Sequence, residues 1–117
     1  MSDPVPERAQ RAQLDGSVIT GWDSFHDQSA SVFGFPAFYG RNMNAWIDCL
    51  TYVREGDGMS RFRLGPEAPL VIDVLNSKAF KRNAPEVFEA FLDCVAFVNG
   101  RQAGAGELPA LHVVLLP

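Results

Sequence analysis

The run Leu-Val-Ile-Asp-Val-Leu at positions 70–75 constrains the fold more than any other segment of the chain. A strand with one face in water alternates apolar and polar residues, but this run is apolar on both faces except at Asp73. Such strands are typical of parallel sheets, which helices cover. The run therefore predicts a buried strand in a parallel sheet.

Two more segments have the composition of strands. Residues 11–14 fit a short first strand, which ends at the turn signal Asp15-Gly16, and residues 111–116 fit a last strand. Helical segments separate the three strands. The order strand, helices, strand, helix, strand predicts right-handed crossovers. The expected fold class is therefore α/β, a small three-stranded parallel sheet packed with three to four helices.

Two helices are expected between the first and second strands. The first covers residues 24–33, with Asp23 as its N-cap and Gly34 as the residue after its end. The second covers residues 43–53, with Asn42 as its N-cap. Apolar residues at helical spacing predict the buried side of this second helix. They are Ala45, Trp46, Cys49, Leu50 and Val53.

A long helix is expected after the central strand, preceded by a helical turn over residues 77–82. Asn83 fits its N-cap, Pro85 lies in its first turn, and Asn99-Gly100 fits its end. Residues 54–69 are rich in glycine, proline and charge, which predicts an exposed loop of unusual length for a compact domain. The core stripe of the long helix comprises Val87, Phe88, Phe91, Leu92, Val95 and Val98.

The length and charge of the chain exclude several classes of protein. A chain of 117 residues fits one domain, expected over residues 11–117, with residues 1–10 as a loose N-terminal segment. Lys and Arg number 10 against 14 Asp and Glu, so the excess of basic residues that nucleic-acid binding requires is missing. No apolar run is long enough to span a membrane, and the polar start does not resemble a signal peptide. The expectation is a cytoplasmic protein that binds neither nucleic acid nor membrane.

Cysteine and histidine are too few for the usual stabilising frameworks. The chain has 2 Cys, at positions 49 and 94, and 2 His. A disulfide framework or a four-ligand zinc site needs more, so we expect reduced cysteines, no metal and no cofactor. One hypothesis for the function is an enzyme that uses Cys or His chemistry, but no local motif supports it.

The side of helix 43–53 opposite its core stripe is the candidate binding surface. It carries Asn44, Ile47, Asp48 and Thr51, spaced i, i+3, i+4 and i+7. All four are mediocre helix formers, whereas a face selected only for solubility uses more Glu, Lys, Ala or Gln. An exposed Ile beside an Asp indicates a binding surface. The alternative is an ordinary solvated face.

Four other polar residues have structural interpretations. Asp73 interrupts the buried strand, so its carboxylate needs a cation or backbone N–H groups as partners. Asp93 lies on the exposed side of the long helix, where an ordinary surface role is the simplest interpretation. His26 is expected on the surface of the first helix, and His112 in the core or at the edge of the last strand.

Residues 34–51 contain Pro36, Phe38-Tyr39-Gly40 and Asn42, followed by the run Asp48-Cys49-Leu50-Thr51. This motif resembles the barstar family of intracellular ribonuclease inhibitors. The resemblance extends over residues 12–117 and is interrupted mainly by the long loop. It implies a small three-stranded parallel sheet packed with helices. It also implies an inhibitor that plugs a ribonuclease active site with its second helix and the turn before it.

The resemblance implies a role for individual residues. The family's counterpart of Asp48 enters the phosphate-binding site of the enzyme, with the counterparts of Phe38 and Asn42 beside it, and that of Asp93 adds a second acidic contact. The implied partner is an extracellular-type basic ribonuclease or a related toxin enzyme, and the free chain is expected to be a monomer. The expected partner-binding residues are Phe38, Tyr39, Gly40, Asn42, Met43, Asn44, Ile47, Asp48, Thr51 and Asp93.

Several positions depart from the family pattern. An acidic residue is replaced by Asn44, a tryptophan by Ile47, and a tyrosine by Phe38, which lacks the hydroxyl. Two hypotheses about the partner follow. The chain is either an immunity protein that blocks a basic ribonuclease, or a barstar-like binding module whose partner is not a ribonuclease.

Overall fold

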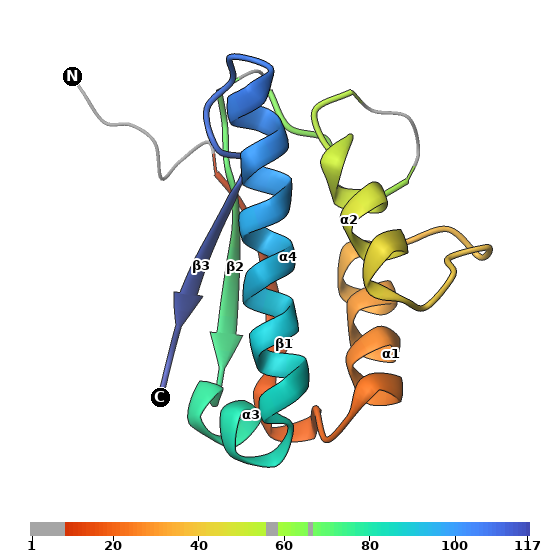
Figure 1. Ribbon diagram of the computed structural model, residues 1–117, viewed down its shortest axis with the longest axis vertical. Helices are drawn as coiled ribbons and strands as arrows, with labels where there is room; N and C mark the ends of the chain where they lie inside the picture. Colours follow the sequence, from red (N-terminus) through yellow and green to blue (C-terminus); the bar gives the residue numbers. More distant parts are fainter. Residues whose placement is uncertain (1–8, 56–58, 66) are drawn as a thin grey trace.

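The computed structural model describes residues 9–55, 59–65 and 67–117. Of the predicted loose N-terminal segment, residues 1–8 lie outside this range, and Gln10 already begins a strand. Figure 1 shows how the elements are arranged. In chain order they are β1 (Gln10–Asp15), a 3-10 turn (Gly16–Val18), α1 (Trp22–Phe33), α2 (Met43–Thr51), β2 (Leu70–Leu75), α3 (Ser77–Asn83), α4 (Pro85–Gly104) and β3 (Leu111–Leu115).

The three strands form one parallel sheet in the order β1-β2-β3, which confirms the predicted fold class. Ala12 pairs with Ile72, and Ile72 pairs with Val113 on the other side. Figure 1 shows α4 running along the front of the sheet, with α1 and α2 beside it. No helix of the described ranges is long and apolar enough to cross a membrane.

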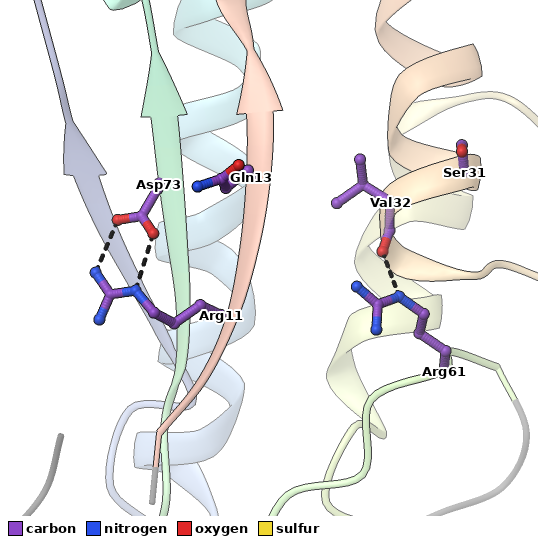
Figure 2. Close-up of a pocket in the computed structure, with 6 residues that line it drawn as sticks. All are labelled: Arg11, Gln13, Ser31, Val32, Arg61 and Asp73. Atoms are coloured by element: carbon purple, nitrogen blue, oxygen red, sulfur yellow. Dashed lines mark hydrogen bonds and ion pairs between the residues drawn. The ribbon is translucent and has the colours of Figure 1, made fainter. Parts of the chain in front are cut away.

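The central strand β2 is buried as the apolar run predicts, including its one carboxylate. Asp73 is 5% exposed. Arg11 on β1 forks onto it, with Nε 3.0 Å from Oδ2 and Nη2 2.9 Å from Oδ1 (Figure 2). Paired hydrogen bonds of this geometry are among the strongest a carboxylate can accept. The predicted need for a partner is therefore met by a neighbouring strand.

Two predicted helix starts are wrong. Helix α1 begins at Trp22 with Gly21 as its N-cap, and Asp23 lies inside its first turn. The Ser24 hydroxyl, inside the first turn, accepts hydrogen bonds from the Thr20 and Gly21 N–H groups that precede the helix. Asn83 ends α3, and Ala84 precedes the first residue of α4. Gly34 adopts the predicted left-handed conformation, with φ 67°.

Helix α4 is one turn longer than predicted. It continues through Gly100 and ends at Gly104. Asn99-Gly100 does not end the helix as expected. The Asn99 side chain accepts a hydrogen bond from the Leu111 N–H on β3 and donates one to the Leu111 carbonyl. A side-chain amide that is hydrogen-bonded to a strand does not compete for the backbone hydrogen bonds of its own helix. The extension places Arg101 and Gln102 on the last turn of α4.

The loop expected over residues 54–69 is not simply exposed. Phe62 and Leu64 are each 4% exposed and belong to the core. Residues 56–58 and 66 of this prediction lie outside the described ranges. The Arg54 side chain is 7% exposed, and it donates hydrogen bonds to the carbonyls of Leu108, Ala68 and Pro109. Arg54 thus joins the end of α2 to the segments before β2 and β3.

We expect replacement of Arg54 by Met to lower the free energy of unfolding by about 2 kcal/mol, because a buried guanidinium that joins three backbone carbonyls is lost. Arg63 is exposed and provides a matched control. Its replacement by Met is expected to change stability by no more than about 0.5 kcal/mol. Urea unfolding of the two variants compares them directly. Equal losses would show that Arg54 does not join these segments.

Candidate functional site

Helix α2 has a firmly held N-terminus. The Asn42 side chain accepts a hydrogen bond from the Ala45 N–H at 2.8 Å, which confirms the predicted N-cap. The helix ends at Thr51 rather than at the predicted residue 53. The cap occupies one acceptor of Asn42. The residue therefore fixes the start of α2 whether or not it also contacts a partner.

The turn before α2 carries the most exposed aromatic residue described. Phe38 is 76% exposed. The Tyr39 N–H donates to the Pro36 carbonyl at 2.9 Å, which closes the turn, while the Tyr39 ring packs against Phe35. A Cβ on Gly40 would lie 3.2 Å from the Asn42 amide nitrogen, closer than most such contacts. The backbone therefore holds Phe38 outward beside the start of α2.

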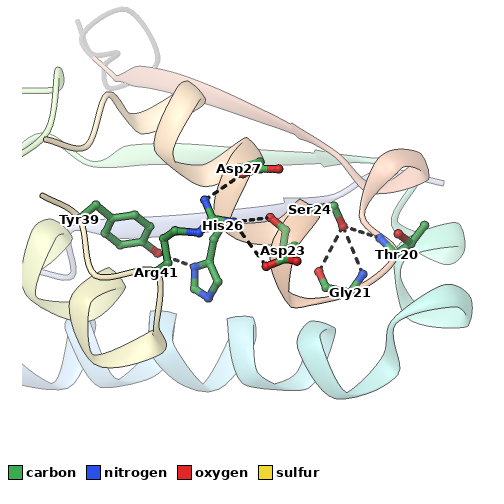
Figure 3. Close-up of polar contacts among 8 residues, drawn as sticks. All are labelled: Thr20, Gly21, Asp23, Ser24, His26, Asp27, Tyr39 and Arg41. Atoms are coloured by element: carbon green, nitrogen blue, oxygen red, sulfur yellow. Dashed lines mark hydrogen bonds and ion pairs between the residues drawn. The ribbon is translucent and has the colours of Figure 1, made fainter. Parts of the chain in front are cut away.

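Helix α1 positions this turn through its contacts with Tyr39 and Arg41 (Figure 3). His26 Nδ1 lies 2.7 Å from the Tyr39 hydroxyl oxygen. Arg41 donates to Asp27 at 2.8 Å and lies 3.6 Å from Asp23. Arg41 has φ 56°, a left-handed conformation that costs free energy for a residue with a side chain. Its ion pairs with Asp23 and Asp27 connect the chain just before α2 to α1.

The prediction that His26 lies on the surface is wrong. The residue is 4% exposed, between Trp22 and Phe25 of its own helix and Tyr39 of the turn. Burial lowers the pKa of His26, and the charge of Arg41 lowers it further, against smaller effects of nearby carboxylates. Burial also raises the pKa of the Tyr39 phenol well above its ordinary value. Both groups are therefore neutral at pH 7.

The exposed side of α2 is narrower than predicted. Asn44 and Asp48 are exposed, but Ile47 is only 9% exposed and belongs to the core. The expectation that Ile47 faces solvent is wrong because α4 packs against this side of α2. The Thr51 hydroxyl donates to the Ile47 carbonyl at 2.6 Å. We define the α2 surface as Phe38, Gly40, Asn42, Asn44 and Asp48, flanked by the half-buried Tyr39, Met43 and Thr51.

Asp48 has an intramolecular partner that the sequence prediction missed. Arg101 on α4 has Nη1 3.4 Å from Asp48 Oδ1 and 3.2 Å from the Thr51 hydroxyl oxygen. Its guanidinium carbon lies 4.9 Å from the ring centre of Phe97, one turn earlier on α4. Phe97 is 53% exposed. The spacing i, i+4 of Phe97 and Arg101 was the available signal, but the predicted helix ended before Arg101.

Asp93 is exposed on α4, as predicted, and the packing of α4 on α2 places the two helices side by side.

His112 is exposed on β3, so the expectation that it lies in the core is wrong and its place at the sheet edge is confirmed. Cys49 and Cys94 are both buried. Burial raises the pKa of the Cys94 thiol, which disfavours a reactive thiolate.

A second polar region lies between β1 and the end of α1. An open pocket of about 410 Å³ is lined by Arg11, Gln13, Ser31, Val32, Arg61 and Asp73 (Figure 2). Its two guanidinium groups are already engaged, one by Asp73 and the other by the Val32 carbonyl at 2.8 Å. Within residues 9–55, 59–65 and 67–117, no group of three His, Cys, Asp or Glu side chains is placed to hold a metal ion.

A three-stranded parallel sheet, four helices, and a capped helix that presents a carboxylate define a small α/β domain with a candidate binding helix. The sequence model of the Barstar family, described as barnase inhibitor, matches residues 9–114. The chain belongs to this family. A comparison with curated protein sequences found no match.

The buried, neutral His26 predicts that the protein loses stability in mild acid. The unfolded chain binds a proton at His26 as the pH falls through about 6.5, whereas the folded chain resists protonation because its His26 pKa is lowered. Unfolding free energy therefore decreases from pH 7.5 downward until the pH reaches the folded pKa.

Replacement of His26 by Gln should flatten this dependence, measured by urea unfolding between pH 7.5 and 5. The matched control is His112→Gln, which removes the chain's other histidine from an exposed position on β3. An unchanged slope in the His26 variant would contradict the assignment.

Proposed function

We propose that this chain is an immunity protein that blocks the active site of a basic ribonuclease with its α2 surface. The observation that carries the proposal is the placement of Asp48. Its side chain is 58% exposed on a helix that is capped at its start and packed on α4. The family match supports an inhibitor role, and the enzyme inhibited is the part we add.

The proposed mechanism is replacement of the substrate's phosphate by a carboxylate. A ribonuclease binds a phosphodiester, so its cleft presents Arg or Lys side chains. Asp48 would accept charge-assisted hydrogen bonds from them, and rigid attachment to α2 lowers the entropy lost on binding. Phe38 would stack at the rim of the cleft, and Asp93 on α4 would add a second acidic contact. No bond is made or broken on the inhibitor.

The proposal includes the environment in which inhibition occurs. We place the chain in the cytoplasm, where it would meet the enzyme before secretion, and as a monomer when free. The net charge of −4 would steer it toward a basic cleft, with an association rate that falls as salt is added.

A binding module with a partner other than a ribonuclease is the second candidate. The observation that favours it is the mixed charge of the surface. Position 44 is Asn rather than an acid, and Arg41 and Arg101 lie beside the exposed residues. A surface of this kind fits a partner that is not uniformly basic.

The decisive experiment is inhibition of RNA hydrolysis. The purified chain is titrated into a panel of basic secreted ribonucleases, barnase included, with a fluorogenic RNA substrate. Stoichiometric inhibition of one member supports the immunity protein. Failure against the whole panel, with the chain shown to be folded, would reject it and leave the second candidate.

Replacement of Asp48 by Ala is expected to weaken binding to the inhibited ribonuclease by at least about 2 kcal/mol, or about thirtyfold in Kd. The carboxylate that replaces the phosphate is lost, and the enzyme's cations remain unpaired. Titration calorimetry measures the change.

Glu86→Ala is the matched control, since it removes the same charge from the first turn of α4, about 22 Å along the helix from Arg101. If both variants weaken binding equally, net charge rather than the position of Asp48 determines affinity.

A further inference from the structure

The last turn of α4 places a positive charge directly beside the proposed phosphate-replacing carboxylate. Arg101 Nη1 lies 3.4 Å from Asp48 Oδ1 and donates to the Thr51 hydroxyl at 3.2 Å. A carboxylate that enters a basic cleft has no need of a cation from its own chain. The proposed role of Asp48 therefore does not explain why Arg101 lies beside it.

The ion pair between the two residues is weak enough to be exchanged. The Asp48 and Arg101 side chains are 58% and 41% exposed, and a single N–O contact joins them. Exposed pairs of this kind add little to stability, whereas a forked contact inside a dry cleft is much stronger. A cation of the partner would therefore displace Arg101 from Asp48.

Arg101 remains at the surface after this exchange, because other groups hold it. Its guanidinium lies over the exposed Phe97 ring at 4.9 Å, and Thr51 still accepts its hydrogen bond. Its Nε and Nη2 atoms have no hydrogen-bond partner among the residues that the structure describes. The guanidinium would then lie within a few ångströms of the partner's cation, and like charges repel strongly where water is excluded.

We propose that Arg101 is a specificity-determining residue, which exchanges Asp48 for a carboxylate of the partner when the complex forms. The partner that fits is a ribonuclease whose phosphate-binding cations are flanked by an Asp or Glu side chain. Charges would then alternate across the interface, from partner cation to Asp48 to Arg101 to partner carboxylate. This inference rests on the proposed function. It adds the requirement that the partner carries a carboxylate beside its phosphate-binding cations, which an acidic helix face alone would not need.

The test compares two variants that lose the same charge. Arg101→Met keeps the apolar stem over Phe97, and Arg82→Met removes an exposed arginine from α3, at the opposite end of α4 (Figure 1). Both variants carry the same net charge, so the comparison separates the position of Arg101 from the effect of net charge alone. Kd is measured by titration calorimetry against the ribonuclease of the panel that the wild type inhibits.

We expect Arg101→Met to bind at least tenfold more weakly than Arg82→Met, because the partner's carboxylate loses its counter-ion in the interface. Arg101→Lys, which keeps the charge but not the planar fork, is expected to lose about threefold. The lysine variant decides the question if the methionine variant does not fold.

Binding by Arg101→Met that equals or exceeds that of Arg82→Met would overturn the inference, since Arg101 would then only compete with the partner for Asp48. The proposed function would stand in that case, because the wild type still inhibits. If the wild type inhibits no ribonuclease of the panel, the proposed function and this inference both fall.

Discussion

The burial of one tryptophan under α2 connects the elements that the candidate surface depends on. Trp46 is fully buried, and its ring meets Phe25 and Phe33 of α1 and Phe91 of α4. Its indole N–H donates to the Ser29 hydroxyl at 3.2 Å, so the polar edge of the ring is also satisfied. Because one side chain contacts both supporting helices, α2 cannot rotate to present a different face without opening this part of the core.

The sequence predicted the sheet well because its strands are defined by burial. An apolar run such as 70–75 is compatible with few environments, and its single carboxylate required a partner, which Arg11 supplies. Helix limits were predicted less well, since they depend on contacts that the local sequence does not contain. Asn99-Gly100 has the composition of a helix end, but Asn99 bonds to β3 instead, and the helix continues. That one turn decides whether Arg101 reaches Asp48.

The candidate surface shows the same division between local and long-range information. The Asn42 cap and the exposed Asp48 follow from spacing along one helix. The burial of His26 and Ile47 does not, because each is covered by an element distant in sequence, the turn before α2 in one case and α4 in the other. Helical periodicity identifies which residues share a face. It does not show how much of that face a neighbouring helix covers.

A helix that is fixed on its buried side can present a charge with little loss of entropy on binding. This saving in entropy contributes most to affinity when the surface presents few charges. Asn44 removes one acid from the α2 surface, and Arg101 partly neutralises Asp48 in the free chain. If the proposed function holds, net attraction to a basic cleft would therefore be modest. Selectivity would then depend on the positions of single charges, which the left-handed Arg41 and the buried His26 hold in place through α1. Under the proposed function, rigidity of the turn before α2 would contribute to recognition as well as to stability.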